Sequence, residues 1–460
     1  MKREKLATRL GFILLSAGCA IGIGNVWRFP YVTGQSGGGW FVLIYLACLA
    51  LIGLPVLLME FACGRASQRS IARLHEVLTP RKPLWRLHGL VGNAGLVLLM
   101  MFYTVVTGWM FIYFAKSAGG DFAGLSPDEV GAAFGAMLAD PVGQTGAMLG
   151  VCGAAAFICG VGLQKGLERV TKAMMLALLA LIVVLAANSL TLDGALEGLE
   201  FYLVPDFARM KAVGVATVVG NAMNHAFFTL SLGIGAMAIF GSYVDKRHTL
   251  LNEGLTVAAL DTFVAICAGL IIIPACFAFK LEPGQGPGLV FVTLPNVFNA
   301  MRGGRFWGSL FFLFMSFAAF STVLAVFEGI IAGAMEATGW SRRRVCVLLA
   351  CVLPVLSLPC VLGFNVWRDV HPLGPGSGIL DLEDFLVSDL ALPLGGLAFA
   401  LYCTHRFGWG WEAFRAEANA GAGLRVPNGL RLYCAYVLPL LVGGIIAVSL
   451  IHRFAPNAMT

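Results

Sequence analysis

The sequence predicts an all-α membrane protein with eleven membrane-spanning helices. Of its 460 residues, 58% are hydrophobic and only 12% are charged, and the mean hydropathy is +0.84. Soluble domains carry about 25% charged residues. The apolar residues fall into runs of about 20, which is the length that an α-helix needs to cross the hydrocarbon core of a bilayer. The composition therefore argues against a set of soluble domains.

The apolar runs define the expected spans, which occupy residues 9–34, 39–64, 90–116, 143–161, 166–189, 213–241, 253–279, 305–337, 345–363, 384–405 and 431–452. The first run follows basic residues, as the core of a signal peptide does, but it continues past the point where cleavage would fall. We therefore expect it to remain as the first span, and we treat residues 1–460 as one polytopic membrane domain.

Lysine and arginine are distributed unevenly between the connecting segments. One alternating set of segments holds 22 basic residues and the other holds 8. Because basic residues stay on the cytoplasmic side, we expect a cytoplasmic N-terminus and, with an odd number of spans, a C-terminus outside. The richer set consists of residues 1–9, 65–86, 165–172, 246–247, 342–344 and 406–431. The lack of N-x-S/T acceptors and the short tails favour a bacterial inner membrane.

Several function classes find no support in the sequence. The net charge of +6 is small and lies in loops, which argues against nucleic-acid binding. The twelve cysteines are scattered without a C-x-x-C pair, so we expect free buried thiols and neither a zinc site nor a disulfide framework. No nucleophile–base set or metal cluster suggests an enzyme.

Two predicted spans contain interruptions. Both "AIGIGN" (20–25) and "TLSLGIGA" (229–236) include the tripeptide GIG, and the second lies five spans after the first. Each glycine destabilises a helix interior by about 1 kcal/mol relative to alanine. One alternative is close helix packing at small residues. A dinucleotide-binding loop is excluded, because Trp27 stands where its third glycine belongs.

Paired interruptions in two halves of a chain indicate the binding site of a transporter. Unwound backbone at membrane depth persists only where protein buries it or where it lines a cavity. The C-terminus of a half-helix offers free carbonyl groups to a cation such as Na⁺, and the N-terminus of a half-helix offers N–H groups to a carboxylate. One broken helix can therefore hold a cation and an amino acid together.

The residues that surround these interruptions resemble the neurotransmitter:sodium symporter family, which includes the bacterial leucine transporter. The similar stretches are "GCAIGIGNVWRFPYVTGQSGGGWF" (18–41), "HAFFTLSLGIGAM" (225–237), "PGLVFVTLPNVF" (287–298) and "KGLERVTK" (165–172). The resemblance covers the whole chain. It implies the leucine-transporter (LeuT) fold with broken spans 1 and 6, a first repeat at about 9–189, an inverted second repeat at about 213–405, and an eleventh span at 431–452.

The resemblance also implies two sodium sites built from hard oxygen ligands. The first comprises the Ala20 carbonyl and the side chains of Asn25, Thr229 and Asp261, completed by the substrate carboxylate. The second comprises the carbonyls of Gly18, Ile21 and Ala318 and the hydroxyls of Ser321 and Thr322. The alternative for these two hydroxyls is a hydrogen bond to their own helix backbone.

Asp261 replaces the usual asparagine of the family within an apolar span, where a carboxylate is costly and indicates function. Chloride-dependent members of the family hold an anion beside the first sodium site. The corresponding surround here is Tyr45, His225, Thr229 and Asp261, and Ala265 stands where the leucine transporter has a glutamate. We expect Asp261 to supply the negative charge, so that transport requires no chloride.

Gly22 indicates the substrate class, because monoamine transporters of the family have aspartate there. A substrate that brings its own carboxylate is therefore expected. By resemblance, its polar groups contact Ala20, Ile23, Gly24, Tyr103, Phe228 and Ser231. Its side chain contacts Leu99, Tyr103, Phe228, Ile234, Thr322 and Val326. This second set carries no charge, which favours neutral, hydrophobic L-amino acids from leucine to tryptophan.

The resemblance further implies two gates. Arg28 is expected to pair with Asp384 above a lid of Tyr103 and Phe228, and Arg3 is expected to pair with Glu336 at the inner end. Leu6 replaces the tryptophan of the family's inner gate. Two other intramembrane carboxylates, Glu60 and Glu328, are expected to brace the unwound segments.

The sequence thus predicts a sodium-coupled amino-acid symporter whose functional unit is a monomer. Two alternatives stay open at this point. One is a proton-coupled transporter of the same fold with Asp261 as the proton carrier. The other is a sensor or channel that binds the amino acid without transporting it.

Overall fold

The described part of the chain is helical. The computed structural model describes residues 4–280 and 288–454, in which the one β-contact is an isolated bridge between His248 and Ala422. The helices are α1 Arg9–Ala20, α2 Phe29–Gln35, α3 Gly39–Cys48, α4 Leu54–Ser67, α5 Ile71–Leu78, α6 Trp85–Gly119, α7 Pro127–Ala139, α8 Pro141–Val161, α9 Arg169–Ser189, α10 Ala195–Leu203, α11 Phe207–Val213, α12 Val215–Thr229, α13 Ala236–Gly241, α14 Leu250–Ala278, α16 Leu294–Ala300, α17 Gly304–Thr338, α18 Arg342–Leu362, α19 Ile379–Asp384, α20 Leu392–Thr404, α21 Trp411–Ala418, α22 Leu430–Leu432 and α23 Leu438–Phe454.

Within those described ranges, nine helical segments are long and apolar enough to cross a membrane, or ten if the bent pair α1–α2 counts as one span. These nine segments begin and end within about five residues of the predicted spans. The sequence predicted eleven spans. The difference is the predicted span 213–241, which divides into α12 with 15 residues and α13 with 6. A bilayer crossing needs about 20 helical residues, so neither piece meets that length alone.

Proline explains most of the π-helical turns. Six such turns occur in the described residues, at Gly24–Arg28, Leu49–Gly53, Leu163–Glu168, Leu289–Thr293, Phe385–Ala391 and Tyr433–Val437. In five of them a proline lies two residues beyond the turn: Pro30, Pro55, Pro295, Pro393 and Pro439. Proline has no N–H for the carbonyl four residues earlier, and its ring crowds that carbonyl, so the preceding turn widens.

The freed carbonyl groups can find other donors. The carbonyl of Leu51, four residues before Pro55, accepts a hydrogen bond of 2.7 Å from the Tyr433 hydroxyl. Tyr433 begins the π-helical turn before α23, so this bond ties the last predicted span to the second.

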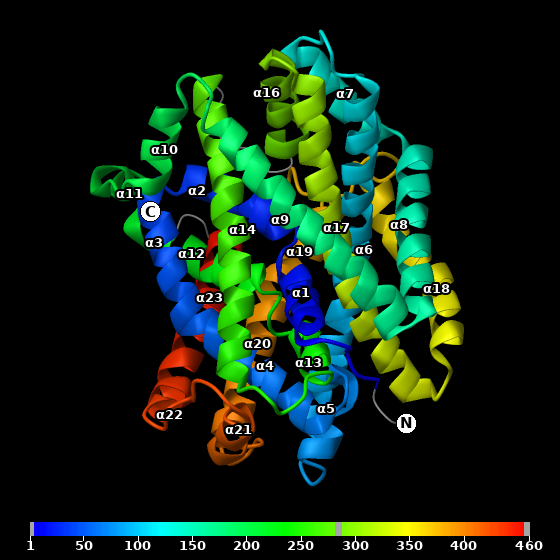
Figure 1. Ribbon diagram of the computed structural model, residues 1–460, viewed down its shortest axis with the longest axis vertical. Helices are drawn as coiled ribbons and strands as arrows, with labels where there is room; N and C mark the ends of the chain where they lie inside the picture. Colours follow the sequence, from blue (N-terminus) through cyan, green and yellow to red (C-terminus); the bar gives the residue numbers. More distant parts are fainter. Residues whose placement is uncertain (1–3, 281–287, 455–460) are drawn as a thin grey trace.

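The two 35-residue helices α6 and α17 pack against each other in the bundle (Figure 1). Helices α8 and α18 cover one side of this pair, and α9 crosses the bundle obliquely. Short helices α7, α10 and α16 lie at one end, and α5, α21 and α22 lie at the other (Figure 1). Helix α1 contacts α13, α14 and α17, so the interruption after α1 lies inside the bundle.

Candidate functional site

The first interruption separates α1 from the rest of the first predicted span. Helix α1 ends at Ala20, and its C-cap residue Ile21 has a ψ angle of 88°, far from the helical value. The chain resumes at Gly24 in a π-helical turn, and the two parts of the span meet at an angle of 54°. Carbonyl groups in the last turn of α1 therefore lack intrahelical donors. They are available to groups on neighbouring helices.

The second interruption lies between α12 and α13. Residues 230–235 form turns, in which Ser231, Gly233 and Gly235 have φ angles of 51°, 103° and 76°. Glycine adopts this left-handed region without strain, which explains two of the three positions. The Glu60 carboxylate on α4 accepts hydrogen bonds from the Gly233 N–H group and, at 3.2 Å, from the Met237 N–H group. Glu60 thus braces the second unwound segment, as expected from the sequence.

A cluster of oxygen atoms lies between α1 and α17. The Thr322 hydroxyl lies 3.1 Å from the Gly18 carbonyl oxygen, 3.5 Å from that of Ile21 and 3.4 Å from that of Ala318. The Ser321 hydroxyl donates to the Ala318 carbonyl at 3.0 Å, which is the bond within its own helix that the sequence left open. The structure therefore brings together all five residues predicted for the second sodium site.

A second polar cluster joins the first interruption to α12 and α14. The Asn25 amide nitrogen donates to Asp261 Oδ1 at 2.8 Å and to Thr229 Oγ1 at 3.1 Å. Thr229 in turn donates to Asp261 Oδ2 at 2.9 Å. All three side chains are at most 1% exposed. These three residues, predicted for the first sodium site, form one connected hydrogen-bonded group beside the break at Gly22–Ile23.

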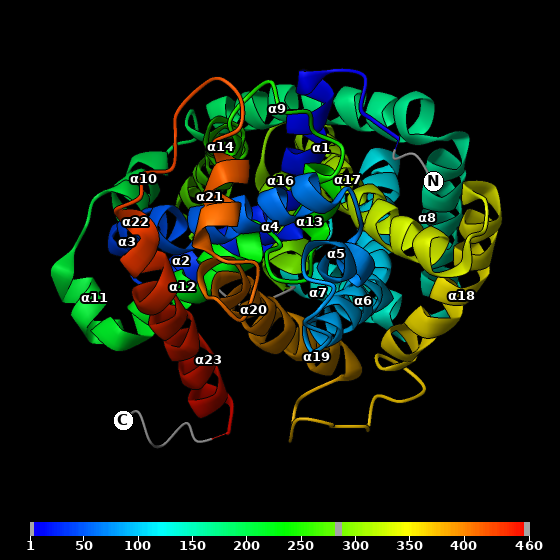
Figure 2. The ribbon, with the colours of Figure 1, turned by 90° about the horizontal axis from the view of Figure 1, so that it is seen from below.

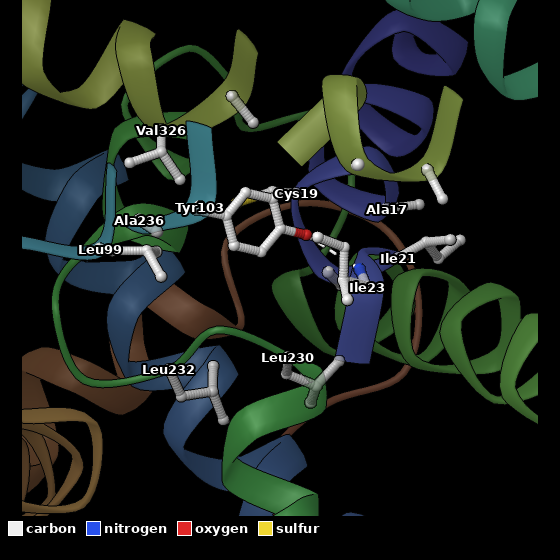
Figure 3. Close-up of a cluster of buried hydrophobic side chains, with 14 of the residues drawn as sticks. Ala17, Cys19, Ile21, Ile23, Leu99, Tyr103, Leu230, Leu232, Ala236 and Val326 are labelled. Atoms are coloured by element: carbon white, nitrogen blue, oxygen red, sulfur yellow. Dashed lines mark hydrogen bonds between the residues drawn. The ribbon is translucent and has the colours of Figure 1, made fainter. Parts of the chain in front are cut away.

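A small cavity lies between the two interruptions. Its lining consists of Cys19, Ala20, Gly22, Gly24, Leu99, Tyr103, Phe228, Ser231, Thr322 and Leu392. None of these residues is charged at neutral pH. The Tyr103 hydroxyl accepts a hydrogen bond of 2.9 Å from the Ile23 N–H group, drawn as a dashed line in Figure 3. The cavity volume is about 20 Å³, close to the space of one water molecule, so an amino acid can enter only when the walls move apart.

Two residues predicted for the side-chain pocket do not line this cavity. Ile234 lines a different cavity, between α6 and α20, because the turns at Gly233 and Gly235 direct it toward Gly95 on α6. Val326 belongs to the surrounding hydrophobic cluster, together with Leu99 and Tyr103 (Figure 3). The sequence interpretation missed Cys19 and Leu392. Adjacency to the first break could have indicated Cys19, and Leu392 directly precedes Pro393.

The predicted outer gate is not in contact. Among the described residues, Arg28 and Asp384 do not form an ion pair. Arg28 instead lies over the Phe228 ring, 4.5 Å from its centroid, and its buried Nη1 atom has no hydrogen-bond partner. The Asp384 carboxylate accepts a hydrogen bond of 2.5 Å from Ser388. The cation–π contact therefore takes the place of the expected pair.

At the inner end, Glu336 accepts hydrogen bonds from Ser70, at 2.6 Å from its hydroxyl and 3.1 Å from its N–H group. Arg3, the predicted partner of Glu336, lies outside the described residues.

Glu328 differs from the expectation, because it does not touch the unwound segments. It pairs with Arg342 at 2.6 Å and accepts a hydrogen bond from Tyr243. Its position on α17, near the start of α18, places it too far along the helix to reach the break.

At the position where the family resemblance predicts an anion site, the His225 ring packs among aromatic side chains. The His225 ring lies 5.3 Å from the Tyr45 ring and 5.4 Å from the Phe29 ring, measured between centroids. Neither ring nitrogen of His225 has a hydrogen-bond partner among the described residues. Ala265 is fully buried on α14, one turn from Asp261.

Nowhere in residues 4–280 or 288–454 do three or more His, Cys, Asp or Glu side chains gather as metal ligands would.

Two broken helices line an uncharged cavity, and two clusters of oxygen groups lie at the first of the two breaks. This arrangement is typical of a secondary transporter. A model of the sodium:neurotransmitter symporter family matches residues 3–124 and 138–458. The chain belongs to this family. It is a multi-pass membrane protein and a sodium-dependent transporter, not an enzyme.

Individual relatives agree with this assignment. The uncharacterized sodium-dependent transporter YhdH of Bacillus subtilis is 35% identical over 401 residues, which cover 87% of each chain. An uncharacterized sodium-dependent transporter of Haemophilus influenzae is 30% identical, with 87% of this chain and 89% of the relative covered. The crystal structure of MhsT in complex with L-phenylalanine superposes with a TM-score of 0.87 at 39% identity, covering 97% of this chain and 100% of MhsT.

Proposed function

We propose that this protein is a sodium-coupled symporter that imports neutral, hydrophobic L-amino acids by alternating access. The observation that carries the proposal is that two buried oxygen clusters lie at the same helix break that lines one uncharged cavity. An uncharged cavity would leave a charged side chain without a partner, which is costly. The phenylalanine bound to the similar MhsT supports a hydrophobic substrate.

The two clusters are proposed as two sodium sites. At the first, Na⁺ would take the place of the hydrogen bonds among Asn25, Thr229 and Asp261, with the Ala20 carbonyl and the substrate carboxylate as further ligands. At the second, Na⁺ would lie between Thr322, Ser321 and the carbonyls of Gly18, Ile21 and Ala318. Asp261 would neutralise the first cation, so we propose that transport requires no chloride.

The substrate is proposed to lie between the two breaks. Its carboxylate would meet the N–H groups near Ile23 and Gly24 and the Tyr103 hydroxyl, which already accepts from the Ile23 N–H group. Its amino group would meet the Ala20 and Phe228 carbonyls and Ser231. Its side chain would contact Leu99, Tyr103, Phe228 and Thr322, with Leu392 added from the cavity lining. Ile234 and Val326, which do not line the cavity, would then support the residues that contact the substrate side chain.

We further propose that α12 and α13 together form the sixth crossing, which completes the eleven spans. This gives spans 1–5 and 6–10 the inverted relation of the LeuT fold, with breaks at equivalent places. The excess of basic residues in one set of loops supports a cytoplasmic N-terminus and an external C-terminus in a bacterial inner membrane. The functional unit would be a monomer.

In the transport cycle, spans 1, 2, 6 and 7 would tilt against spans 3, 4, 8 and 9. The Thr322 contacts link α1 of the first group to α17 of the second, so Na⁺ at this site would hold the two groups together. Its release to the inside would free them to part. Outer closure would bring Arg28 from Phe228 toward Asp384.

Uptake into proteoliposomes tests the proposal. Radiolabelled phenylalanine and leucine should accumulate under an inward Na⁺ gradient and fail to accumulate under an equal K⁺ gradient. Uptake that follows a pH gradient without Na⁺ would favour the proton-coupled alternative with Asp261 as carrier. Sodium-dependent binding without accumulation would favour a sensor.

A further inference from the structure

A deep groove opens on the side of the bundle between α6 and α20, outside the proposed substrate site. Its volume is about 760 Å³, within the range of small-molecule pockets. The N-terminal end of α6 lies beside α20, and Figure 2 shows these two helices from below. The outer walls include Leu87, Val91 and Leu394, whose side chains are 65%, 52% and 49% exposed. Large exposed apolar side chains on a membrane protein face lipid chains, so the groove opens toward the bilayer.

The mouth of the groove has the character of a membrane–water interface. Trp85 lies at this mouth, donates a hydrogen bond of 2.8 Å to the Phe407 carbonyl, and stacks parallel to the Phe407 ring. Tryptophan gathers at the level of the lipid headgroups. The mouth lies at the end of α6 that adjoins the 65–86 segment, one of the basic segments of the chain.

Two cations lie at this mouth. Arg81 lines the groove and, among the described residues, takes part in no hydrogen bond or ion pair. Lys82 also lines it and donates hydrogen bonds to the carbonyls of Arg406 and Gly408, both at 2.6 Å. One of its three N–H groups is left to bind an anion. The lining, all of it described, contains no acidic residue. An amino acid would find no partner for its ammonium group there, whereas an anion would find two cations.

The inner end of the groove reaches the second unwound segment. Gly233 and Ile234 form part of its lining, and they lie between α12 and α13. His88 on the wall is bonded to His75 at 2.8 Å. The arginine and the lysine of the lining, Arg81 and Lys82, both lie at the mouth of the groove.

We propose that this groove binds an anionic phospholipid of the leaflet that faces the basic loops. One acyl chain lies along Leu87, Val91 and Leu394 and ends against Gly233 and Ile234, and the phosphate meets Arg81 and Lys82. Basic pockets between membrane helices on the cytoplasmic side are a known form of anionic-headgroup recognition. Because Ser231 and Leu392 line the proposed substrate cavity while Gly233 and Ala391 line the groove, the bound chain contacts the other side of the same backbone.

Photolabelling of the full-length protein in vesicles tests this proposal. One set of phosphatidylcholine vesicles contains phosphatidylglycerol with a diazirine in mid-chain, and a matched set contains phosphatidylcholine with the same diazirine. After illumination, labelled peptides are identified by mass spectrometry. We expect phosphatidylglycerol to label the α6 and α20 residues of the groove about fivefold more than phosphatidylcholine does. Equal labelling by the two lipids, or labelling spread evenly over all lipid-facing helices, would overturn the proposal.

Two pairs of variants separate specific binding from general lipid contact. Arg81→Glu should remove the preference for phosphatidylglycerol, while Arg343→Glu, at an exposed position at the start of α18, should keep it. Ala398→Trp should fill the groove and suppress its labelling by both lipids, while Ala154→Trp on the exposed face of α8 should not. Equal effects within either pair would contradict the proposal. Elution of each variant as a monodisperse peak confirms folding, and neither labelling result depends on the substrate or the coupling ion.

Discussion

The Thr322 hydroxyl on α17 lies 3.1 Å from the Gly18 carbonyl oxygen on α1. Ser321, the residue before it, donates instead to the Ala318 carbonyl of its own helix, at 3.0 Å. Two adjacent hydroxyl groups therefore differ in role: one spans the gap to the broken helix, and the other stays within α17. Both nevertheless lie beside the same free carbonyls at the end of α1, because the helix stops at Ala20.

The shared position of the two hydroxyls beside these carbonyls predicts the effects of removing each one. Thr322→Val keeps the shape of the side chain but removes an oxygen ligand, so we expect the sodium concentration for half-maximal uptake to rise about tenfold or more. That corresponds to about 1.4 kcal/mol of lost binding free energy. Ser321→Ala should act in the same direction. Sodium titration of phenylalanine uptake in proteoliposomes measures both.

Ser316→Ala is the matched control for these two variants. Ser316 is buried on the same helix, but its hydroxyl donates at 2.7 Å to the Phe312 carbonyl, away from α1. Its sodium dependence should equal that of the unaltered protein. If all three variants shifted the sodium titration equally, general weakening of α17 would be the cause and the proposed second site would be wrong.

Much of the fold was predictable because the bilayer imposes a single length on every crossing. Nine spans follow from apolar runs alone, and the bend at 20–24 follows from glycines in an apolar run. The clustering of Asn25, Thr229 and Asp261 was predictable only through the resemblance to a family, since these residues are 204 and 236 positions apart along the chain.

The rest depends on geometry that the sequence interpretation did not contain. The positive φ angles of Gly233 and Gly235 decide which cavity the Ile234 side chain lines. The sequence alone does not show the direction in which an apolar side chain points. Glu328 could be recognised as a buried carboxylate, but its partner Arg342 stands 14 positions later, in the next helix. The π-helical turns did have a sequence signal in the prolines that follow them, at Pro30 and four other sites.

Asp261 provides a second prediction, on the role of charge. In the unaltered protein, replacement of chloride by gluconate should leave the uptake rate unchanged. Asp261→Asn keeps an oxygen near Asn25 and Thr229 but removes the negative charge that would balance Na⁺, so sodium affinity should fall by about tenfold or more. Uptake that disappears in gluconate for the unaltered protein would show that an external anion supplies the charge.

Gly22 provides a third prediction, on the size of the site. A Cβ atom at this position would lie 2.8 Å from Thr322 Oγ1 and closer still to the Tyr103 hydroxyl. Gly22→Ala should therefore abolish substrate binding, measured by scintillation proximity with labelled phenylalanine. Gly150→Ala on α8 is the control, because a Cβ atom there meets nothing within 4 Å. Full binding by Gly22→Ala would place the substrate elsewhere.

The Glu328–Arg342 pair provides a fourth prediction, on stability. Glu328 is fully buried and Arg342 is 13% exposed, and the two are joined by bonds of 2.6 and 2.9 Å. Arg342→Ala leaves a buried carboxylate without its cation, so the free energy of unfolding should fall by about 3–5 kcal/mol. Thermal unfolding in detergent measures the loss, and the exposed neighbour Arg343→Ala serves as control. A smaller loss in the double variant with Glu328→Gln would confirm that the stranded charge is the cause.

Arg28 provides the last prediction, because it contacts Phe228 and does not pair with Asp384. If the outer gate closes by moving Arg28 from the Phe228 ring to Asp384, the pair forms only during the cycle. Arg28→Gln and Asp384→Asn should then each slow uptake at saturating phenylalanine while sodium-dependent binding persists. Their effects should be strongly non-additive, with a coupling of about 0.5–3 kcal/mol in the double variant. Arg368→Gln, at a position 75% exposed, is the control and should leave the rate unchanged. Strictly additive effects would mean that the two side chains never meet, and the cation–π contact with Phe228 would then be the resting place of Arg28 throughout transport.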